Sequence, residues 1–251
     1  SSYPLSLRTS FILDICAHFK SIVQRLMDHQ SNIATITKQK NDYYWSDSRE
    51  PHFQRRKDIL AKHPEVTKLF GIDPSLKYKT VGLVTLQLVV AYFAYLLNWW
   101  QFILVAFFVG ATVAHALFLA IHEITHDLAF KSKKNNNILA LIANLPIVIP
   151  YAMSFKVYHA MHHWEQGKDG VDTDIPSRNE AKIFRGFIGK VVWFLHQIIF
   201  YALRPGFIKP IKLEKWQWYN ILFQVAVMAV FLPVAGWAGV SFLLLSLLFA
   251  G

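Results

Sequence analysis

Two short clusters of histidines are the residues of this chain best suited to chemistry. The first is His122-Glu-Ile-Thr-His126 and the second is His159-Ala-Met-His162-His163. Residues three or four apart share one face of a helix, so each cluster can direct its imidazoles toward one place. Imidazole binds iron, zinc and copper, and these five side chains predict a metal site. His115 lies one heptad before His122 on the same face.

The choice of metal separates three interpretations. His122-Glu123-Ile-Thr-His126 matches HExxH, in which the glutamate is the general base of a zinc protease. The second cluster supplies more imidazoles than one tetrahedral ion needs, which favours two metals. Two irons can activate oxygen, so we favour a di-iron oxidase or desaturase over an intramembrane zinc protease. A metal sensor or transporter is least favoured, because the expected spans carry few polar side chains.

The composition indicates an integral membrane protein. The chain has 251 residues, of which 54% are apolar, and a mean hydropathy of +0.29. Its net charge of +10 fits the positive-inside rule and also an acidic protein partner. Nucleic-acid binding is excluded, because the basic residues flank apolar runs. The single cysteine, Cys16, excludes an internal disulfide and a cysteine-rich metal site.

Two uncharged runs predict the membrane spans. The run from Thr80 to His122 is about twice the ~20 residues that one span needs, so we expect helices at about Thr80–Leu97 and Trp100–His122. They meet at the polar, aromatic joint Asn98–Gln101. A second hairpin is expected at about Tyr219–Leu232 and from Ala238 onward.

The segments between the hairpins predict helices at the membrane surface. Pro146 and Pro150 interrupt Asn137–Phe155, so an interfacial or re-entrant piece is expected there rather than a span. Val191–Leu203 is too short to span and suits one helix lying on the membrane.

The sequence therefore predicts an all-α integral membrane protein with two transmembrane hairpins, about four spans, interfacial helices and a histidine-rich cap. Residues 1–41 are a leader, a disordered segment or an amphipathic one. Residues 42–79 form a cytosolic amino-terminal segment with a helix near Pro51–Lys62, and residues 80–251 form the membrane domain. The positive-inside rule places the hairpin bases and both histidine clusters on the cytosolic side. The bases carry Lys77, Lys79, Lys131, Lys133, Lys134, Lys209, Lys212 and Lys215.

Several stretches resemble the sphingolipid delta-4 desaturases of the membrane fatty acid desaturase family. The histidine clusters match two of the family's histidine boxes, and the flanking residues match as well. The resemblance runs from about Asp42 to Gly251. It is carried by Pro51–Glu65, Leu119–His126, Ala143–Ile147, Ile149–Tyr151, Ser154–His159 and Asp169–Pro176.

The resemblance implies an enzyme of the endoplasmic reticulum membrane that converts dihydroceramide to ceramide. It implies two irons, molecular oxygen, and electrons from NADH through cytochrome b5 and its reductase. Some members hydroxylate carbon 4 instead, and another membrane fatty-acyl desaturase or hydroxylase is the alternative within the wider family. The implied iron ligands are His122, His126, His159, His162 and His163, with His115 near the site.

Acidic residues have weaker implied roles. The resemblance makes Glu123 a residue that orients a ligand. Asp169, Asp172 and Asp174 either orient ligands, line the substrate entrance or form a solvated loop. His196 is expected to be structural.

The resemblance also includes a third histidine box beyond the fourth span, and the sequence stops before it at Gly251. We therefore expect the membrane domain to be incomplete at this end and the polypeptide as given to be inactive.

Overall fold

The computed structural model describes residues 51–250, and these residues form helices and connecting turns with no strand. Residues 1–50 and Gly251 lie outside the described part, so the expectation for residues 1–41 cannot be compared with it. The helices are α2 (Pro51–Lys62), α3 (Leu76–Phe93), α4 (Trp99–Val105), α5 (Thr112–Thr125), α6 (Lys133–Asn144), α7 (Ala152–Trp164), α8 (Arg178–Ile183), α9 (Gly186–Leu195), α10 (Gln197–Ile208) and α11 (Lys215–Ala250). Shorter elements are η1 (Pro64–Leu69), η2 (Ala94–Leu96), η3 (Ala106–Ala111) and η4 (Leu145–Ile147).

The chain divides into two units. Within the described residues, one unit contains residues 178–192 and the other contains residues 51–177 and 193–250. In the described part of the first unit, α8 ends at Ile183 and a short turn leads into α9. Gly186 has a φ of 66° at this turn, a conformation that glycine adopts without steric cost. The core, the histidine clusters and the groove described below all lie in the second unit.

Three helical stretches are long and apolar enough to cross a membrane: Leu76–Leu96, Trp99–Thr125 and Lys215–Ala250. The first two correspond to the predicted first hairpin. Asn98 separates them as a helix cap, since its side chain accepts from Gln101 N at 3.1 Å and its own N–H donates to Gln101 Oε1 at 3.2 Å. The predicted joint is therefore where the first hairpin turns.

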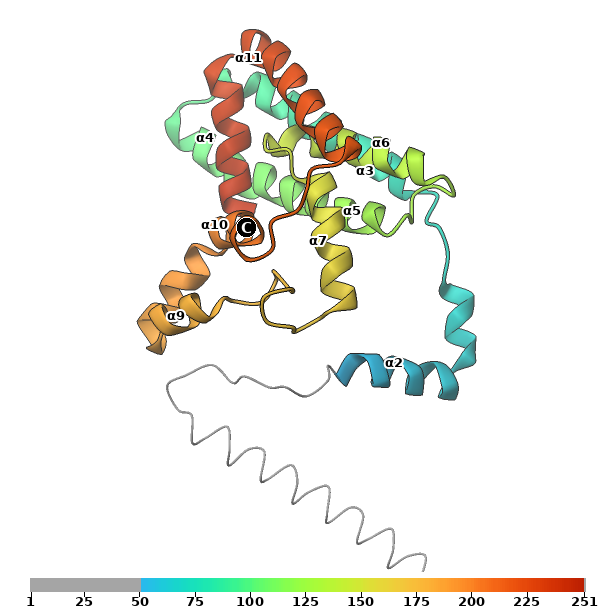
Figure 1. Cartoon of the computed structure of the whole chain (residues 1–251). Coiled ribbons are helices and arrows are strands. Elements are labelled where there is room, and N and C mark those ends of the chain that lie inside the picture. The colour runs from blue at the N-terminus through green and yellow to red at the C-terminus, as the bar shows by residue number, and fades with distance from the viewer. Residues whose placement is uncertain (1–50, 251) are drawn as a thin grey trace, which may run out of the picture. The chain divides into compact units, whose positions relative to one another are not determined.

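The third stretch, α11, consists of two arms. Its 36 residues would extend about 54 Å at 1.5 Å per residue, more than the ~30 Å hydrocarbon core. Gly236 leaves helical geometry with a φ of 65°, and the two arms fold back on each other there (Figure 1). This is where the second hairpin was predicted to turn, and the number of spans stays a prediction.

One of the two predicted surface segments is broken as expected, and the other differs from its prediction. The interrupted Asn137–Phe155 segment corresponds to α6 and α7, which bend by 113° at a break that contains Pro150. The single helix predicted over Val191–Leu203 is wrong, because α9 ends at Leu195 and α10 begins at Gln197. His196 between them has φ −105° and ψ 12°. No glycine or proline marks this break, so apolar periodicity could not show it.

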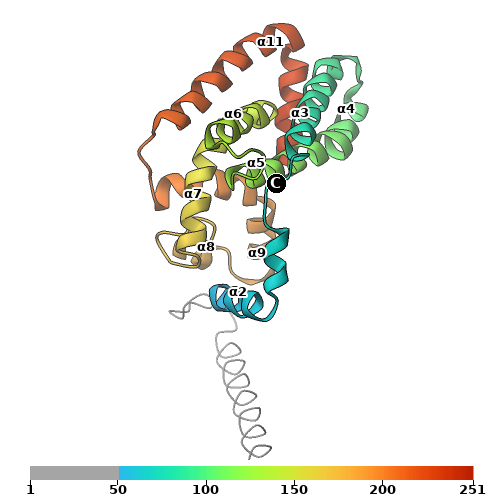
Figure 2. The ribbon, with the colours of Figure 1, turned by 90° about the vertical axis from the view of Figure 1, so that its right-hand side faces the viewer.

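The core lies where α3, α5, α6 and α11 pack together (Figure 2). Ile121, Ile124, Leu139 and Met153 are buried in one cluster. The π-helical turn η3 sits against the second arm of α11. A Cβ at Gly110 would clash with the Ser246 side chain and lie 3.0 Å from Phe242, so only glycine permits this approach.

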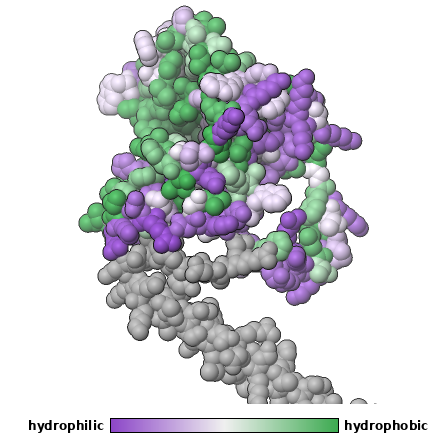
Figure 3. All heavy atoms as spheres, viewed as in Figure 1, coloured by the Kyte–Doolittle hydropathy of each residue, from purple (hydrophilic) through white to green (hydrophobic). Residues whose placement is uncertain are grey.

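Outward faces of the long helices are apolar. Large exposed side chains on them include Leu86 and Val89 on α3, and Val225, Trp237 and Leu248 on α11. Figure 3 shows apolar side chains over the upper part of the view, where α11 lies, and hydrophilic ones where α3 and α6 begin. So much exposed apolar surface fits contact with lipid.

Candidate metal centre

The first histidine cluster lies at the end of α5. His122 is in the last turn of this helix, and His126 follows as its C-cap residue. Asp127 then adopts a left-handed conformation, with a φ of 62°, and turns the chain away. Lys156 on α7 donates to Asp127 Oδ1 at 3.0 Å and so ties the end of α5 to α7.

The second cluster lies on the last two turns of α7. His159 and His163 are one turn apart and face the end of α5, and His162 lies between them in sequence. His159 is only 8% exposed, because it stacks on Phe155 and lies among the other imidazoles. The helix therefore presents these histidines to the first cluster.

Four imidazoles meet at one point. His126 Nε2 lies 2.9 Å from His159 Nε2, which in turn lies 3.0 Å from His163 Nε2. The rings of His122 and His159 have centroids 4.5 Å apart. One ligand nitrogen from each of the four histidines lies within 4.8 Å of the others. Nitrogens that converge in this way from two separate helices suit a transition-metal ion.

His162 belongs to a second group of possible ligands. Its Nδ1 lies 3.0 Å from both carboxylate oxygens of Asp172 and 3.5 Å from Asp174 Oδ2. Its ring centroid lies 5.6 Å from that of His163 and 6.0 Å from that of His159. Since Asp172 occupies Nδ1, the Nε2 atom of His162 is the one left to bind a metal.

The loop that carries these carboxylates is held in place from several sides. Asp172 has a fully buried side chain and accepts from the backbone N–H groups of Gly167, at 2.7 Å, and Asp174, at 2.9 Å. Arg204 on α10 donates to the carbonyl oxygen of Thr173 at 3.1 Å. A buried, hydrogen-bonded aspartate contradicts a solvated role for Asp172, whereas Asp169 is exposed.

Glu123 and His115 occupy different places. Glu123 accepts from His122 Nδ1 at 3.0 Å, which orients that ring and leaves Nε2 toward the cluster. His115 is exposed, and its Nδ1 atom lies 3.3 Å from the carbonyl oxygen of Ala250. It is not among the four clustered histidines. The structure thus does not bring His115 to the others.

A row of amides positions α7, and the sequence interpretation did not identify it. Asn144 at the end of α6 accepts from Tyr151 N and Ala152 N at 2.9 and 2.7 Å, and so caps the start of α7. It donates to Gln224 on α11 at 2.8 Å, and Gln224 donates to the carbonyl oxygen of Leu145 at 3.0 Å.

Two further amides of α11 extend this row. Asn220 accepts from Met153 N at 3.1 Å, and Gln217 donates to Met153 O at 3.3 Å. Asn220 thus satisfies a backbone N–H in the first turn of α7, where the helix offers no partner, and Gln217 adds a second tie to the same residue. The sequence feature that could have revealed this row is the spacing of Gln217, Asn220 and Gln224, which places all three on one face of a helix.

The surroundings of three clustered imidazoles favour their neutral form. His126, His159 and His163 lie outside the three long apolar stretches. Burial, and then the neighbouring imidazoles, lower the pKa of His126 and His163 and bring the pKa of His159 to about 3. Neutral imidazole is the form that binds metals, so the donors fit a transition-metal site.

Comparison with known proteins agrees with this geometry. Residues 97–251 match the family described as Fatty acid desaturase. The chain belongs to this family. Residues 39–75 match a second family, described as Sphingolipid Delta4-desaturase. No solved structure matches the chain.

Similar curated proteins are named sphingolipid delta(4)-desaturases. A protein of Oryza sativa subsp. japonica named sphingolipid delta(4)-desaturase DES1-like is 43% identical over 84% of this chain and 64% of its own length. A sphingolipid delta(4)-desaturase of Candida albicans is 42% identical over 84% of this chain and 58% of its own. A protein of Rattus norvegicus named sphingolipid delta(4)-desaturase/C4-monooxygenase DES2 is 37% identical over 82% and 65%.

These matches confirm the resemblance to sphingolipid delta-4 desaturases. The chain spans 58% to 65% of the length of these three curated relatives.

Proposed function

We propose that this chain is the larger part of a sphingolipid delta-4 desaturase, which converts dihydroceramide to ceramide with molecular oxygen. The observation that carries the proposal is the meeting of four imidazoles from α5 and α7 in a chain of the fatty acid desaturase family. The names of the relatives supply the substrate class.

The residues of the proposed iron site divide into ligands and supports. His122, His126, His159 and His163 would hold one iron, and His162 would contribute to a second. Glu123 and Asp172 fix the rings of His122 and His162 through Nδ1. When bound, iron supplies the redox chemistry that lets oxygen attack an unactivated C–H bond. The protein holds the ligands in place, and the lowered pKa values of His126, His159 and His163 favour their neutral form.

The remaining parts of the proposal concern membrane and partners. The lysine-rich hairpin bases support a cytosolic position of the histidine clusters, in the endoplasmic reticulum membrane. Electrons would come from NADH through cytochrome b5 and its reductase, and the net charge of +10 suits an acidic electron donor.

Hydroxylation at carbon 4 is a second candidate outcome, because the rat relative is named for both activities. A zinc intramembrane protease is not favoured. The HExxH segment fits it, but a third and a fourth imidazole lie at the same point, and the family match points to desaturation.

The test is to supply labelled dihydroceramide to cells that express the full-length protein but have no desaturase of their own. Desaturation gives labelled ceramide, and hydroxylation gives phytoceramide. We expect His163→Ala to lower product formation more than about 100-fold, since even loss of a residue supporting a metal ligand costs 10–100-fold.

His63→Ala is the matched control, because His63 is 60% exposed and lies outside the cluster. If the His163→Ala variant forms as much product as the wild type, the proposed iron site is wrong. If the purified protein contains zinc and cleaves peptides, the protease hypothesis is correct and the desaturase hypothesis is wrong.

A further inference from the structure

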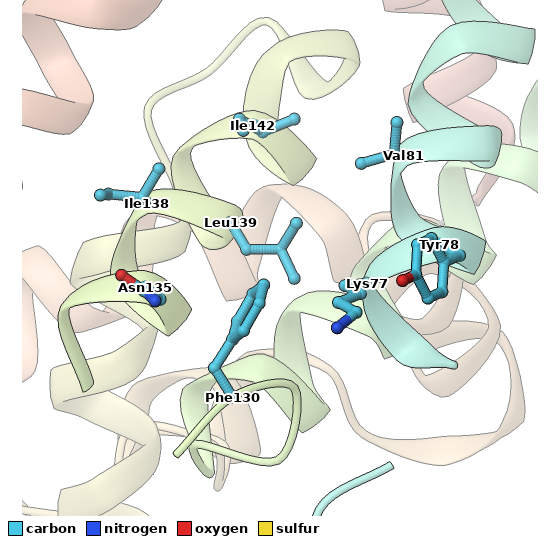
Figure 4. A pocket seen from close by; sticks show the side chains of 8 residues that line it. All are labelled: Lys77, Tyr78, Val81, Phe130, Asn135, Ile138, Leu139 and Ile142. Carbon is cyan, nitrogen blue, oxygen red and sulfur yellow. The ribbon is translucent and has the colours of Figure 1, made fainter. Parts of the chain in front are cut away.

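A groove separate from the histidine cluster lies between the start of α3 and α6 (Figure 4). Its volume is about 430 Å³, within the range of small-molecule sites. No histidine lines it. The lining residues are Lys77, Tyr78 and Val81 of α3, Phe130 of the loop before α6, and Asn135, Ile138, Leu139 and Ile142 of α6.

The floor of the groove is apolar and fixed. Leu139 is 4% exposed and belongs to the main core, and Phe130 packs against that core. Asn136, which is fully buried, holds the Phe130 loop: it accepts from Ala129 N and Phe130 N, both at 3.1 Å, and donates to Phe130 O at 2.7 Å. The groove is therefore a preformed apolar surface.

One side of the groove is open. Tyr78 and Val81, on the first long apolar helix, and Ile138, on α6, line it and are exposed. An extended hydrocarbon chain could enter from the surrounding lipid without crossing protein. A compact polar ligand would find few partners on these walls.

The mouth of the groove is basic. Lys77 holds its ammonium 5.2 Å from the centre of the Phe130 ring and 5.0 Å from that of Tyr78. The loop and helix turn between Phe130 and Asn135 add Lys131, Lys133 and Lys134. Among residues 51–250, no carboxylate forms an ion pair with any of these four lysines. Figure 3 shows hydrophilic side chains gathered at this end of α3 and α6.

We propose that this groove binds an anionic membrane phospholipid, with one acyl chain between α3 and α6 and the headgroup phosphate beside Lys77. The apolar floor matches the chain, and the unpaired lysines at its mouth match the negative headgroup. Basic pockets between membrane helices on the cytosolic side bind such lipids. A neutral lipid would use the floor but would gain nothing from the lysines.

The test uses purified full-length protein in a non-ionic detergent. Phosphatidylserine or phosphatidylcholine with identical acyl chains is added in stepped amounts, and bound lipid is measured by native mass spectrometry. We expect phosphatidylserine to bind more tightly than phosphatidylcholine and to raise the unfolding temperature more, because the choline ammonium cancels the phosphate charge and the two lipids share the same apolar floor. Lys77→Gln should weaken binding about five-fold, since one lysine near a lipid surface contributes ~1 kcal/mol.

Two matched pairs of variants locate the site. Ile138→Trp should fill the groove and abolish binding, while Leu86→Trp, at a position 45% exposed elsewhere on α3, should not. Lys79→Gln should bind as the wild type does, because Lys79 already pairs with Asp73 at 3.4 Å. Equal binding of both lipids, unchanged binding in Ile138→Trp and Lys77→Gln, or tighter binding of neutral dihydroceramide than of phosphatidylserine would overturn the proposal.

Discussion

Carboxylates at the Nδ1 atoms decide which way two of the imidazoles face. Glu123 takes Nδ1 of His122, and Asp172 takes Nδ1 of His162, each at 3.0 Å. Each ring then has only Nε2 for a metal. The two arrangements differ in burial, since Glu123 is exposed whereas the Asp172 side chain is fully buried. Asp172 is therefore the residue whose loss should disturb the site most.

We predict that Asp172→Asn weakens iron binding by about 10–100-fold, because the amide loses the charge that fixes the His162 ring. The measurement is iron per polypeptide after dialysis against chelators of increasing strength. Asp169→Asn is the control, since Asp169 is exposed on the same loop. If both variants keep iron equally well, Asp172 has no such role.

At the scale of elements, sequence patterns could predict where most helices lie. They could not predict all the contacts between those helices. The uncharged runs and the Asn98 joint predicted the first hairpin, and the two prolines predicted the break between α6 and α7. Helical spacing also predicted that His122 and His126 share a face. These features depend on local residue order, which the sequence shows directly.

Other features depend on residues far apart in the chain. The contact of Asn144 with Gln224 joins two elements that the sequence gives no reason to pair. His162 faces Asp172 rather than the other imidazoles because a loop folds back on α7, and spacing within one helix cannot show this. The break at His196 likewise has no local signal.

Gln224→Leu should lower the free energy of unfolding by about 1–3 kcal/mol for each buried group that it leaves without a partner. The group left without a partner is one N–H of the Asn144 amide, whose other N–H donates to the carbonyl oxygen of Ile149 at 2.8 Å. The carbonyl oxygen of Leu145 loses the bond from Gln224 and keeps only the one from Val148 N, at 3.4 Å. Because Asn144 caps α7, the variant should also bind less iron. Thermal unfolding and iron content measure the two effects.

Val225→Ala is the control, because Val225 is next in sequence but 62% exposed on the outer face. Equal stability of the two variants would show that the row of amides does not hold α7 in place.

For the whole molecule, the distribution of charge defines two ends. Lysines gather at the starts of α3 and α6 and around the start of α11, whereas the Asn98 joint and the Gly236 turn carry no charge. The histidine clusters lie at the end of α5 and on α7, far along the chain from both turns. On the positive-inside rule, we predict that the lysines and the histidines lie together on the cytosolic side.

Sidedness can be measured with single cysteines in sealed microsomes, after Cys16→Ser removes the natural one. We predict that Lys133→Cys and Trp164→Cys react with a membrane-impermeant maleimide from the cytosolic side. Trp99→Cys and Trp237→Cys, at the two turns, should react only after the vesicles are opened. Labelling of Lys133→Cys and Trp164→Cys from opposite sides would contradict a shared cytosolic site.

The row of amides on α11 also has a consequence for biosynthesis. The ribosome makes α5, α6 and α7 before it makes Gln217, Asn220 and Gln224, which complete the hydrogen bonding of the turn into α7. Until α11 enters the bilayer, that turn has open amide and carbonyl groups in an apolar environment. Iron uptake should accordingly be a late event in maturation, after the insertion of a helix that contributes no imidazole to the cluster.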